Sequence, residues 1–191
     1  LLMKKIGITG GIGSGKTYVA EVFQSLGIPI FYADSQANKL MISSEKLIKL
    51  LKEEFGNEIY ENADLNKEKL ASIVFSNSDK LQKLNSLVHP IVKEEFNNWC
   101  KKKTSPYVIK EAAILFESKS HLGLDEVICV SAPLALRMKR LLKRDNFNEK
   151  EIKKRIENQI TQEDKEKQSD YIIVNDEKDL LLPQIIKIHK K

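Results

Sequence analysis

Short apolar runs alternate along the chain with stretches whose apolar residues recur at helical spacing. Five of the runs have the length and composition of buried strands: KKIGIT, IPIFYA, YVIKEA, DEVICVS and DYIIVN. Helical or turn-rich sequence separates each run from the next, and this alternation is typical of parallel strands covered by helices. The pattern therefore predicts an α/β fold with a three-layer core and a five-stranded, mostly parallel sheet.

The spacing between the predicted strands is uneven. About seventy residues separate IPIFYA from YVIKEA, and two segments among them, SEKLIKLLKEEFG and SDKLQKLNSLVHPIVKEEFNNWCKKK, have apolar residues at helical spacing. A second helix-rich, highly charged stretch runs from PLALRMKRLLKRD to QEDKEKQSD. We expect a core of residues 3–34, 105–132 and 168–191, a helical insertion over 35–104, and a solvent-facing lid over 133–167.

The composition indicates the general class of protein but not its function. The chain has 191 residues, 41% hydrophobic and 31% charged, which is typical of a globular domain. No apolar run approaches the roughly 20 residues that a membrane helix needs, so we expect a cytoplasmic protein. Cys100 and Cys129 follow no metal-binding spacing and are interpreted as reduced packing thiols. The net charge of +5 suits an anionic ligand of any kind.

The first predicted strand leads into GGIGSGKT, a segment with the residues of a phosphate-binding loop. Gly10, Gly15, Lys16 and Thr17 match the phosphate-loop pattern G-x-x-x-x-G-K-[ST], with the expected strand before it and a helix after it. Glycines let backbone N–H groups point inward and, with the helix N-terminus, surround a polyphosphate. Lys16 would reach the β- and γ-phosphates, and the Thr17 hydroxyl would bind Mg²⁺. A glycine-rich turn before a surface lysine is the alternative.

Other motifs decide between classes of nucleotide-binding protein. The only Asn-Lys pair, Asn66-Lys67, is not followed by the x-Asp of a guanine-reading motif, and no Asp-x-x-Gly occurs. We therefore do not expect a GTPase switch. A small kinase needs a carboxylate near the phosphate loop and arginines in a closing lid. Both are present, because Asp34 ends the second strand region and arginines recur in the lid.

Asp34 and the lid arginines each have two interpretations. Asp34 could accept a proton from an acceptor hydroxyl, or cap the helix that begins near Ser35. Arg137, Arg140 and Arg144 lie on one face of a predicted helix, opposite an apolar row. We interpret Arg137 as part of a solvated face, and Arg140 and Arg144 as candidates to neutralise phosphate.

A second lid helix is predicted over NEKEIKKRIENQ. Asn148 stands at its N-cap and Glu151 at the capping-box position. Arg155 and Gln159 are expected to share one face of this helix.

The order and spacing of GITGGIGSGKT, ADSQANKL, LVHPIVKEE, ILFES, RLLKRD, RIENQ and SDYIIVN resemble the dephospho-coenzyme A kinases over residues 5–176. The resemblance implies transfer of the γ-phosphate of ATP, with Mg²⁺, to the ribose 3'-hydroxyl of dephospho-coenzyme A, the last step of coenzyme A synthesis. It also implies a phosphate-loop fold like that of nucleoside monophosphate kinases, with residues 35–104 as the coenzyme A-binding domain.

Residue roles follow from the same resemblance. It implies that Asp34 is the catalytic base, that Lys16 and Arg140 stabilise the transferred phosphoryl group, and that Asp34 and His89 bind the acceptor. A turn or packing role for His89, and a backbone or capping role for Asn175, remain open. The implied ATP-binding residues are Gly11, Ile12, Gly13, Ser14, Gly15, Lys16, Thr17, Arg144 and Asn175, with Thr17 also on the metal.

Three positions depart from the family pattern. Tyr32 replaces the first carboxylate of the usual Asp-Ala-Asp, Ala113 replaces a proline, and Tyr18 replaces a small hydroxyl residue. None removes a group that the chemistry requires.

Two other functions are compatible with a phosphate loop in a basic chain. One is a kinase of another small acceptor, such as a nucleoside monophosphate. The other is a basic ATP-binding protein whose partner is nucleic acid. Against the second, the basic residues are interleaved with acidic ones and no stacking platform is evident. We therefore expect a small-molecule enzyme, monomeric or weakly homo-oligomeric, with neither a nucleic-acid nor a membrane partner.

Overall fold

The computed structural model describes residues 3–62, 64–75, 77–144 and 148–191, without the side chains of residues 75 and 144. The chain divides into two compact units, one made of Leu1–Tyr32 and Lys103–Lys191 and the other of Ala33–Lys102. Each unit is described by itself.

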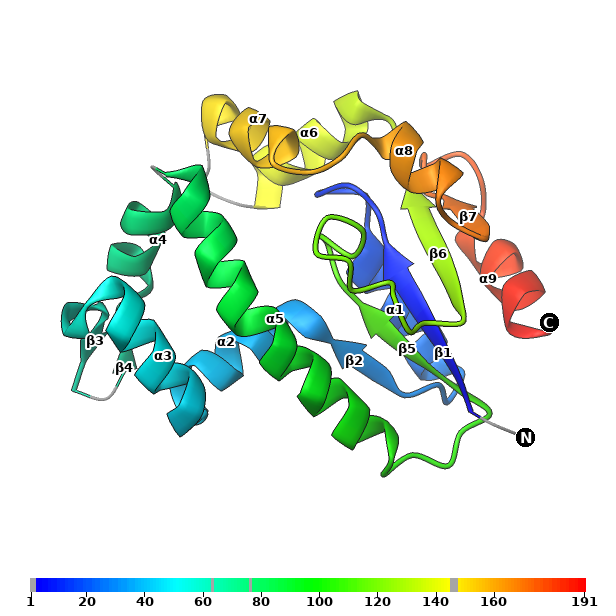
Figure 1. The fold of residues 1–191 in the computed structure, drawn as a ribbon. Coiled ribbons are helices and arrows are strands. Elements are labelled where there is room, and N and C mark those ends of the chain that lie inside the picture. Colours follow the sequence, from blue (N-terminus) through cyan, green and yellow to red (C-terminus); the bar gives the residue numbers. More distant parts are fainter. Residues whose placement is uncertain (1–2, 63, 76, 145–147) are drawn as a thin grey trace. The chain divides into compact units, whose positions relative to one another are not determined.

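The first unit is built on a parallel sheet (Figure 1). Its strands are β1 (Lys4–Thr9), β2 (Ile30–Tyr32), β5 (Tyr107–Glu111), β6 (Glu126–Ser131) and β7 (Tyr171–Val174). They lie in the order β2-β5-β1-β6-β7, and every neighbouring pair is parallel. The prediction of a five-stranded sheet is confirmed, and the sheet is parallel throughout. The strand that leads into the phosphate loop, β1, is therefore the central one.

Helices and irregular segments cover both faces of this sheet. Helices α1 (Lys16–Ser25) and α9 (Leu181–His189) pack on one face, where Val19, Ala20 and Phe23 join Ile6 and Ile8 in the core. On the other face, Gly7 leaves room for Leu115 and Leu124, because a Cβ there would lie 2.7 Å and 2.9 Å from their side chains. Because both faces of the sheet are buried, the strand sequences are short, continuous apolar runs in which polar and apolar residues do not alternate.

Three further helices follow β6. They are α6 (Leu134–Arg144), α7 (Glu149–Glu157) and α8 (Gln162–Lys167), and they lie at the end of the sheet to which the strand arrows point (Figure 1). The predicted capping box is present, since Asn148 and Glu151 each accept a hydrogen bond from the other's backbone N–H. Helix α7 ends at Glu157, so Gln159 lies beyond it and does not share a helical face with Arg155 as expected. The capping box fixes where the helix begins; at the other end Asn158 is the C-cap, and its N–H donates to the carbonyl oxygen of Lys154 at 3.2 Å.

The second unit is mainly helical. It contains α2 (Ala33–Ser43), α3 (Glu45–Phe55), a 3-10 turn (Asn57–Ile59), α4 (Lys67–Phe75) and α5 (Ser78–Cys100). A short antiparallel hairpin, β3 (Tyr60–Glu61) with β4 (Asp64–Leu65), was not anticipated. The long helix α5 contacts each of the other α-helices of the unit (Figure 1).

The amphipathic faces predicted for this unit are its core. In α5 the residues Val88, Val92, Phe96 and Cys100, spaced four apart, are buried. Pro90 lies inside this helix, is exposed and does not end it. In the described part of the chain, no helix is both long and apolar enough to cross a membrane.

Candidate functional site

The phosphate loop joins the end of β1 at Thr9 to the start of α1 at Lys16. Gly15 precedes the helix with φ of 93°, in the left-handed region that favours glycine. Gly10 has φ of 147°, and a Cβ there would lie 2.3 Å from the carbonyl oxygen of Val130 in β6. Only glycine fits at these two positions, and the resulting turn brings the N-terminus of α1 to the end of the central strand.

Two polar side chains of the loop are buried. Ser14 is fully buried, and its Oγ has no hydrogen-bond partner among the described residues. Lys16 is 8% exposed, and its Nζ lies 3.5 Å from the carbonyl oxygen of Gly11. An orphaned hydroxyl and a buried ammonium together favour an anion in the loop, because each buried polar group loses solvation that a phosphate oxygen could replace. The next residue, Thr17, is exposed and therefore accessible to a metal ion.

Arg140 and Asn175 meet at the side of the phosphate loop. Nη2 of Arg140 lies 3.2 Å from both the backbone oxygen and Oδ1 of Asn175, and Nη1 lies 3.4 Å from the carbonyl oxygen of Ser14. The amide of Asn175 donates to that same Ser14 oxygen at 2.8 Å. Glu177 pairs with Arg140 at 3.2 Å. The structure thus places Arg140 and Asn175, both predicted site residues, against the loop. Arg140 is also held by Glu177, which is not among the predicted site residues.

Arg137 corrects the sequence interpretation. It was assigned to a solvated face, but its side chain is only 4% exposed and its Nε donates to the carbonyl oxygen of Ile12 at 2.9 Å. Burial lowers the pKa of its guanidinium, while the neighbouring Glu163 opposes that change. In the same helix Leu134 and Leu142 are 57% and 51% exposed, and Leu141 is buried. Periodicity grouped the arginines together, whereas the packing of the phosphate loop against one turn of α6 decided which of them is buried.

Glu111 is a candidate that the sequence interpretation missed. It is the last residue of β5, lies opposite Ile8 of β1 in the sheet register, and is 6% exposed. In phosphate-loop proteins a carboxylate at the end of a strand beside the loop helps to hold Mg²⁺. The available signal was a strand that ends in an acid, YVIKE, but the sequence alone did not show that this strand is β1's neighbour.

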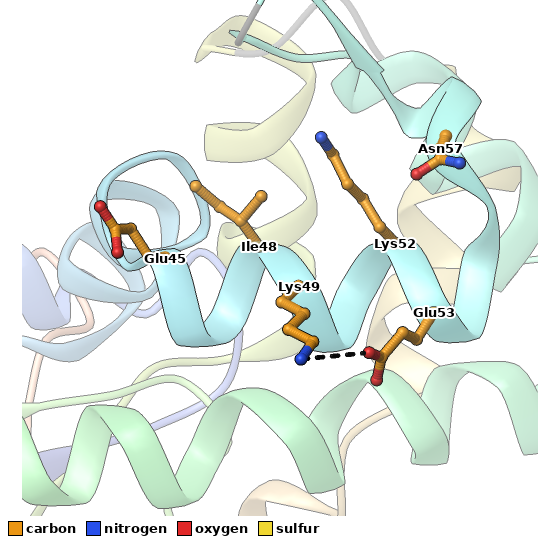
Figure 2. A pocket seen from close by; sticks show the side chains of 6 residues that line it. All are labelled: Glu45, Ile48, Lys49, Lys52, Glu53 and Asn57. Carbon is orange, nitrogen blue, oxygen red and sulfur yellow. Dashed lines mark ion pairs between the residues drawn. The ribbon is translucent and has the colours of Figure 1, made fainter.

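Asp34 and His89 belong to the helical unit, as does the surface hollow in Figure 2. Helix α2 begins at Ala33, so the exposed Asp34 stands inside its first turn and does not precede the helix as an N-cap would. His89 lies partly buried in the middle of α5. The side chain of Arg144, the last residue of α6, falls outside the described part of the chain.

The hollow on α3 has a volume of about 470 Å³ and contains none of the predicted site residues. Ile48 and Lys52 lie on the same side of the helix (Figure 2), where Lys52 Nζ is 5.4 Å from the ring centroid of Tyr60. Lys49 pairs with Glu53 at 4.0 Å, and both are exposed. Because acids and bases alternate around it, this surface has no single sign of charge that would favour an anion. Its lining residues are Glu45, Ile48, Lys49, Lys52, Glu53 and Asn57.

Comparison with protein families decides the class. The family model described as dephospho-CoA kinase matches residues 4–180. The chain belongs to the dephospho-CoA kinase family. It is 37% identical over 185 residues to the dephospho-CoA kinase of Bacteroides fragilis (strain YCH46), covering 96% of this chain and 90% of the relative.

Two solved structures resemble the chain, and one of them is a dephospho-CoA kinase. A crystal structure from Thermus thermophilus matches with a TM-score of 0.84 and 30% identity, over 98% of this chain and 95% of that one. The dephospho-CoA kinase from Campylobacter jejuni matches with a TM-score of 0.67 and 25% identity, over 97% and 95%.

The predictions of family, phosphate-loop kinase fold, enzyme class and last step of coenzyme A synthesis are confirmed. Dephospho-CoA kinases use a nucleotide and act on a small molecule, dephospho-CoA.

The three departures from the dephospho-CoA kinase pattern are accommodated locally. Tyr32 ends β2, and its hydroxyl donates to Oε1 of Gln24 at 3.1 Å. Burial raises the pKa of this tyrosine, and the nearby Glu21 and Glu111 raise it further. Tyr32 therefore does not replace the negative charge of the missing carboxylate. Ala113 offers its backbone oxygen, which a proline would also do, to Lys165 Nζ at 3.1 Å. Tyr18 is 58% exposed.

Proposed function

We propose that this chain transfers the γ-phosphate of ATP to the ribose 3'-hydroxyl of dephospho-CoA, using the phosphate loop between β1 and α1. The observation that carries the proposal is the loop itself: a buried Lys16 and an orphaned Ser14 hydroxyl at the N-terminus of a helix, in a chain of the dephospho-CoA kinase family. Phosphoryl transfer depends mainly on positioning and charge neutralisation, which such a loop supplies.

ATP is assigned to residues of the first unit. The loop of Gly11, Ile12, Gly13, Ser14 and Gly15 surrounds its phosphates. The N–H groups of Gly11, Ile12 and Ser14 already donate within the protein, so we assign the phosphate contacts to the N–H groups of Gly13 and Gly15 and to the Ser14 hydroxyl. Lys16 neutralises the β- and γ-phosphates, and Arg140 stabilises the group in transfer. Asn175 borders the nucleotide beside Arg140, a role supported by their 3.2 Å contact. We also assign Arg144 to the nucleotide side of the lid.

A Mg²⁺ ion fits the donors near the loop. The Thr17 hydroxyl would ligate it directly, and the carboxylate of Glu111 would hold one of its waters, an all-oxygen arrangement that Mg²⁺ prefers. When bound, the ion would supply positive charge to neutralise the charge that develops on the transferring phosphate. The role of the protein is to place the oxygens of Thr17 and Glu111 at the end of the sheet, beside Lys16.

Asp34 is proposed as the base that accepts the proton of the 3'-hydroxyl. The chain covers only two residues from the end of β2 to Asp34, and β2 belongs to the same parallel sheet as β1. Carboxyl ends of parallel strands open on one edge, where ligands of such folds bind. An ionised carboxylate attached there can take up the proton. The helical unit, through Asp34 and His89, is proposed to bind the acceptor.

We extend the proposal to the setting of the enzyme. Residues 35–104 form the coenzyme A-binding domain, 133–167 the lid, and the remainder the nucleotide core. The partner is the small-molecule acceptor rather than nucleic acid or membrane. The enzyme is cytoplasmic and works as a monomer or weak homo-oligomer, which sedimentation at several protein concentrations would test.

The deciding experiment measures ADP release from Mg-ATP with dephospho-CoA, and separately with AMP or CMP as rival acceptors. We expect release to depend on dephospho-CoA, and the product to carry a 3'-phosphate by mass spectrometry after nuclease digestion. ADP formation only with a nucleotide acceptor would retain the phosphate loop and overturn the choice of substrate. Equal ADP release with and without dephospho-CoA, and no phosphorylated product, would indicate ATP hydrolysis and would overturn the proposed transfer.

A further inference from the structure

Three side chains from the segment after β6 hold one side of the phosphate loop. The N–H of Gly11 donates to Oε1 of Gln162 at 3.0 Å, and the N–H of Ile12 donates to Oε1 of Gln159 at 2.9 Å. Arg137 donates its Nε–H to the carbonyl oxygen of Ile12 at 2.9 Å. Both polar groups of Ile12 and the N–H of Gly11 are therefore engaged by side chains more than a hundred residues away in sequence.

These glutamines are themselves fixed by the ends of neighbouring strands. The amide of Gln162 lies 3.4 Å from the carbonyl oxygen of Val130 in β6 and 3.0 Å from Oε1 of Glu166. Gln159 directs its amide to the carbonyl oxygen of Ala113, at 3.5 Å. Because the amide nitrogen of each glutamine is already hydrogen-bonded, its side chain loses little conformational entropy when its oxygen accepts from the loop. Such a fixed side chain holds its partner in a defined position.

The segment between the glutamines is anchored independently. Oε1 of Glu117 accepts from the N–H of Ile160 at 3.1 Å and from Nζ of Lys165 at 2.6 Å. The Lys165 side chain is fully buried, and that of Glu117 is 16% exposed. The backbone that carries Gln159 and Gln162 is thereby attached to the residues that follow β5.

The sequence of the loop fits this arrangement. A Cβ on Gly11 would lie 2.3 Å from Cζ of Arg137, so the guanidinium occupies the space that any other residue would fill. The phosphate-loop pattern leaves this position unspecified, so the contact with Arg137 is what requires a glycine there. The groups engaged here belong to residues 11 and 12, ahead of Lys16 and Thr17 at the start of the helix.

We propose that Arg137, Gln159 and Gln162 are positioning residues for the kinase reaction, which fix the backbone of Gly11 and Ile12 and thereby orient the phosphate loop for the triphosphate. They act through the loop and do not touch the nucleotide. Their removal leaves the loop free to sample other backbone conformations, so nucleotide affinity falls because ordering the loop must then occur on binding. The inference rests on the proposed function only in taking ATP as the nucleotide.

The test uses Gln159→Met and Gln162→Met, which keep the length of the side chain and remove its hydrogen bonds. Both glutamines border a cavity of about 650 Å³, so a methionine side chain has room. The Kd of Mg-ATP is measured by calorimetry without acceptor, and KM for both substrates by ADP release. Gln168→Met, at the exposed C-terminal end of α8, is the matched control. We expect Kd and KM for ATP to rise about five- to tenfold, the usual value of one hydrogen bond, in both variants and not in the control.

A merely structural role predicts a different result. If these residues only support the fold, KM for dephospho-CoA changes by the same factor as KM for ATP, and that outcome would overturn the proposal. ATP affinity within twofold of the wild type would overturn it as well. Gln159→Asn keeps the amide but shortens its reach, so we expect it to behave as Gln159→Met does; wild-type ATP affinity in this variant would also contradict the proposal.

The measurement without acceptor separates this inference from the proposed function. A wild-type protein that binds Mg-ATP but makes no coenzyme A contradicts the proposed function and leaves the test of the glutamines intact. Arg137→Met serves as a third variant in the same assay, with the same expected direction.

Discussion

The guanidinium of Arg140 lies 3.2 Å from two oxygens of Asn175, one from the backbone and one from the side chain, although the residues are 35 positions apart. Glu177 pairs with the same guanidinium through Nη2 at 3.2 Å. Arginine presents its donors in a rigid planar fork, so two acceptors on one residue fix its orientation before any phosphate arrives. A group oriented in advance stabilises developing charge without reorganising during the reaction.

Replacing Arg140 by lysine keeps the charge and removes the fork. We expect kcat to fall about 10²-fold or more, the usual effect of losing one donor to the transferring group, with a smaller change in KM for ATP. Steady-state kinetics would measure both constants. Lys139→Met, an exposed cation on the same helix, is the control and should remain within about twofold. A wild-type kcat for the lysine variant would mean that Arg140 contributes charge alone.

Asn substituted for Asp34 removes the proposed base while preserving shape. We expect kcat to fall by about 10² or more while the Kd of Mg-ATP stays near the wild-type value, because general-base catalysis contributes that much and the nucleotide is bound elsewhere. Asp79→Asn removes an exposed carboxylate from the first turn of another helix of the same unit and should leave kcat unchanged. Near-normal turnover of Asp34→Asn would remove Asp34 from the mechanism.

Glu111 is expected to act through the metal ion. Exchanging it for glutamine should raise the Mg²⁺ concentration for half-maximal activity about 10- to 100-fold, since residues that support a metal site typically contribute that much to its affinity. Titration of activity with Mg²⁺ at saturating ATP would show the change. The control is Glu126→Gln, at the other end of the sheet, where the carboxylate pairs with Lys4. An unchanged Mg²⁺ requirement in Glu111→Gln would exclude it from the metal site.

The ion pair between Lys165 and Glu117, at 2.6 Å, gives a prediction about stability. Lys165→Met leaves a largely buried carboxylate without its cation, so the free energy of unfolding should fall by about 3–5 kcal/mol. The double variant Lys165→Met with Glu117→Met should recover most of this loss. It still lacks the hydrogen bonds from Ile160 to Glu117 and from Lys165 to the carbonyl oxygen of Ala113, each worth about 1 kcal/mol. Urea denaturation would measure both. Lys167→Met, exposed on the same helix, is the control. A loss below about 1 kcal/mol in Lys165→Met would show that Glu117 is reached by water.

The sequence alone determined the features that depend on neighbouring residues. Strand runs, the phosphate-loop pattern and the capping box of Asn148 and Glu151 are local, because backbone preference and short-range hydrogen bonds decide them. The apolar runs were enough to predict the five-stranded sheet, and the order of the motifs to predict the family and its kinase fold; all three are confirmed.

Only the tertiary structure decided which side chains reach the phosphate loop. Arg137 and Arg140 look alike in an amphipathic helix, yet one is buried against Ile12 and the other binds Asn175. Glu111 became a candidate when the sheet order placed its strand beside β1, and Gln162 when its amide was found between Gly11 and Val130. The reason is physical: periodicity specifies which residues share a face, whereas burial and hydrogen bonding depend on what packs against that face from distant parts of the chain.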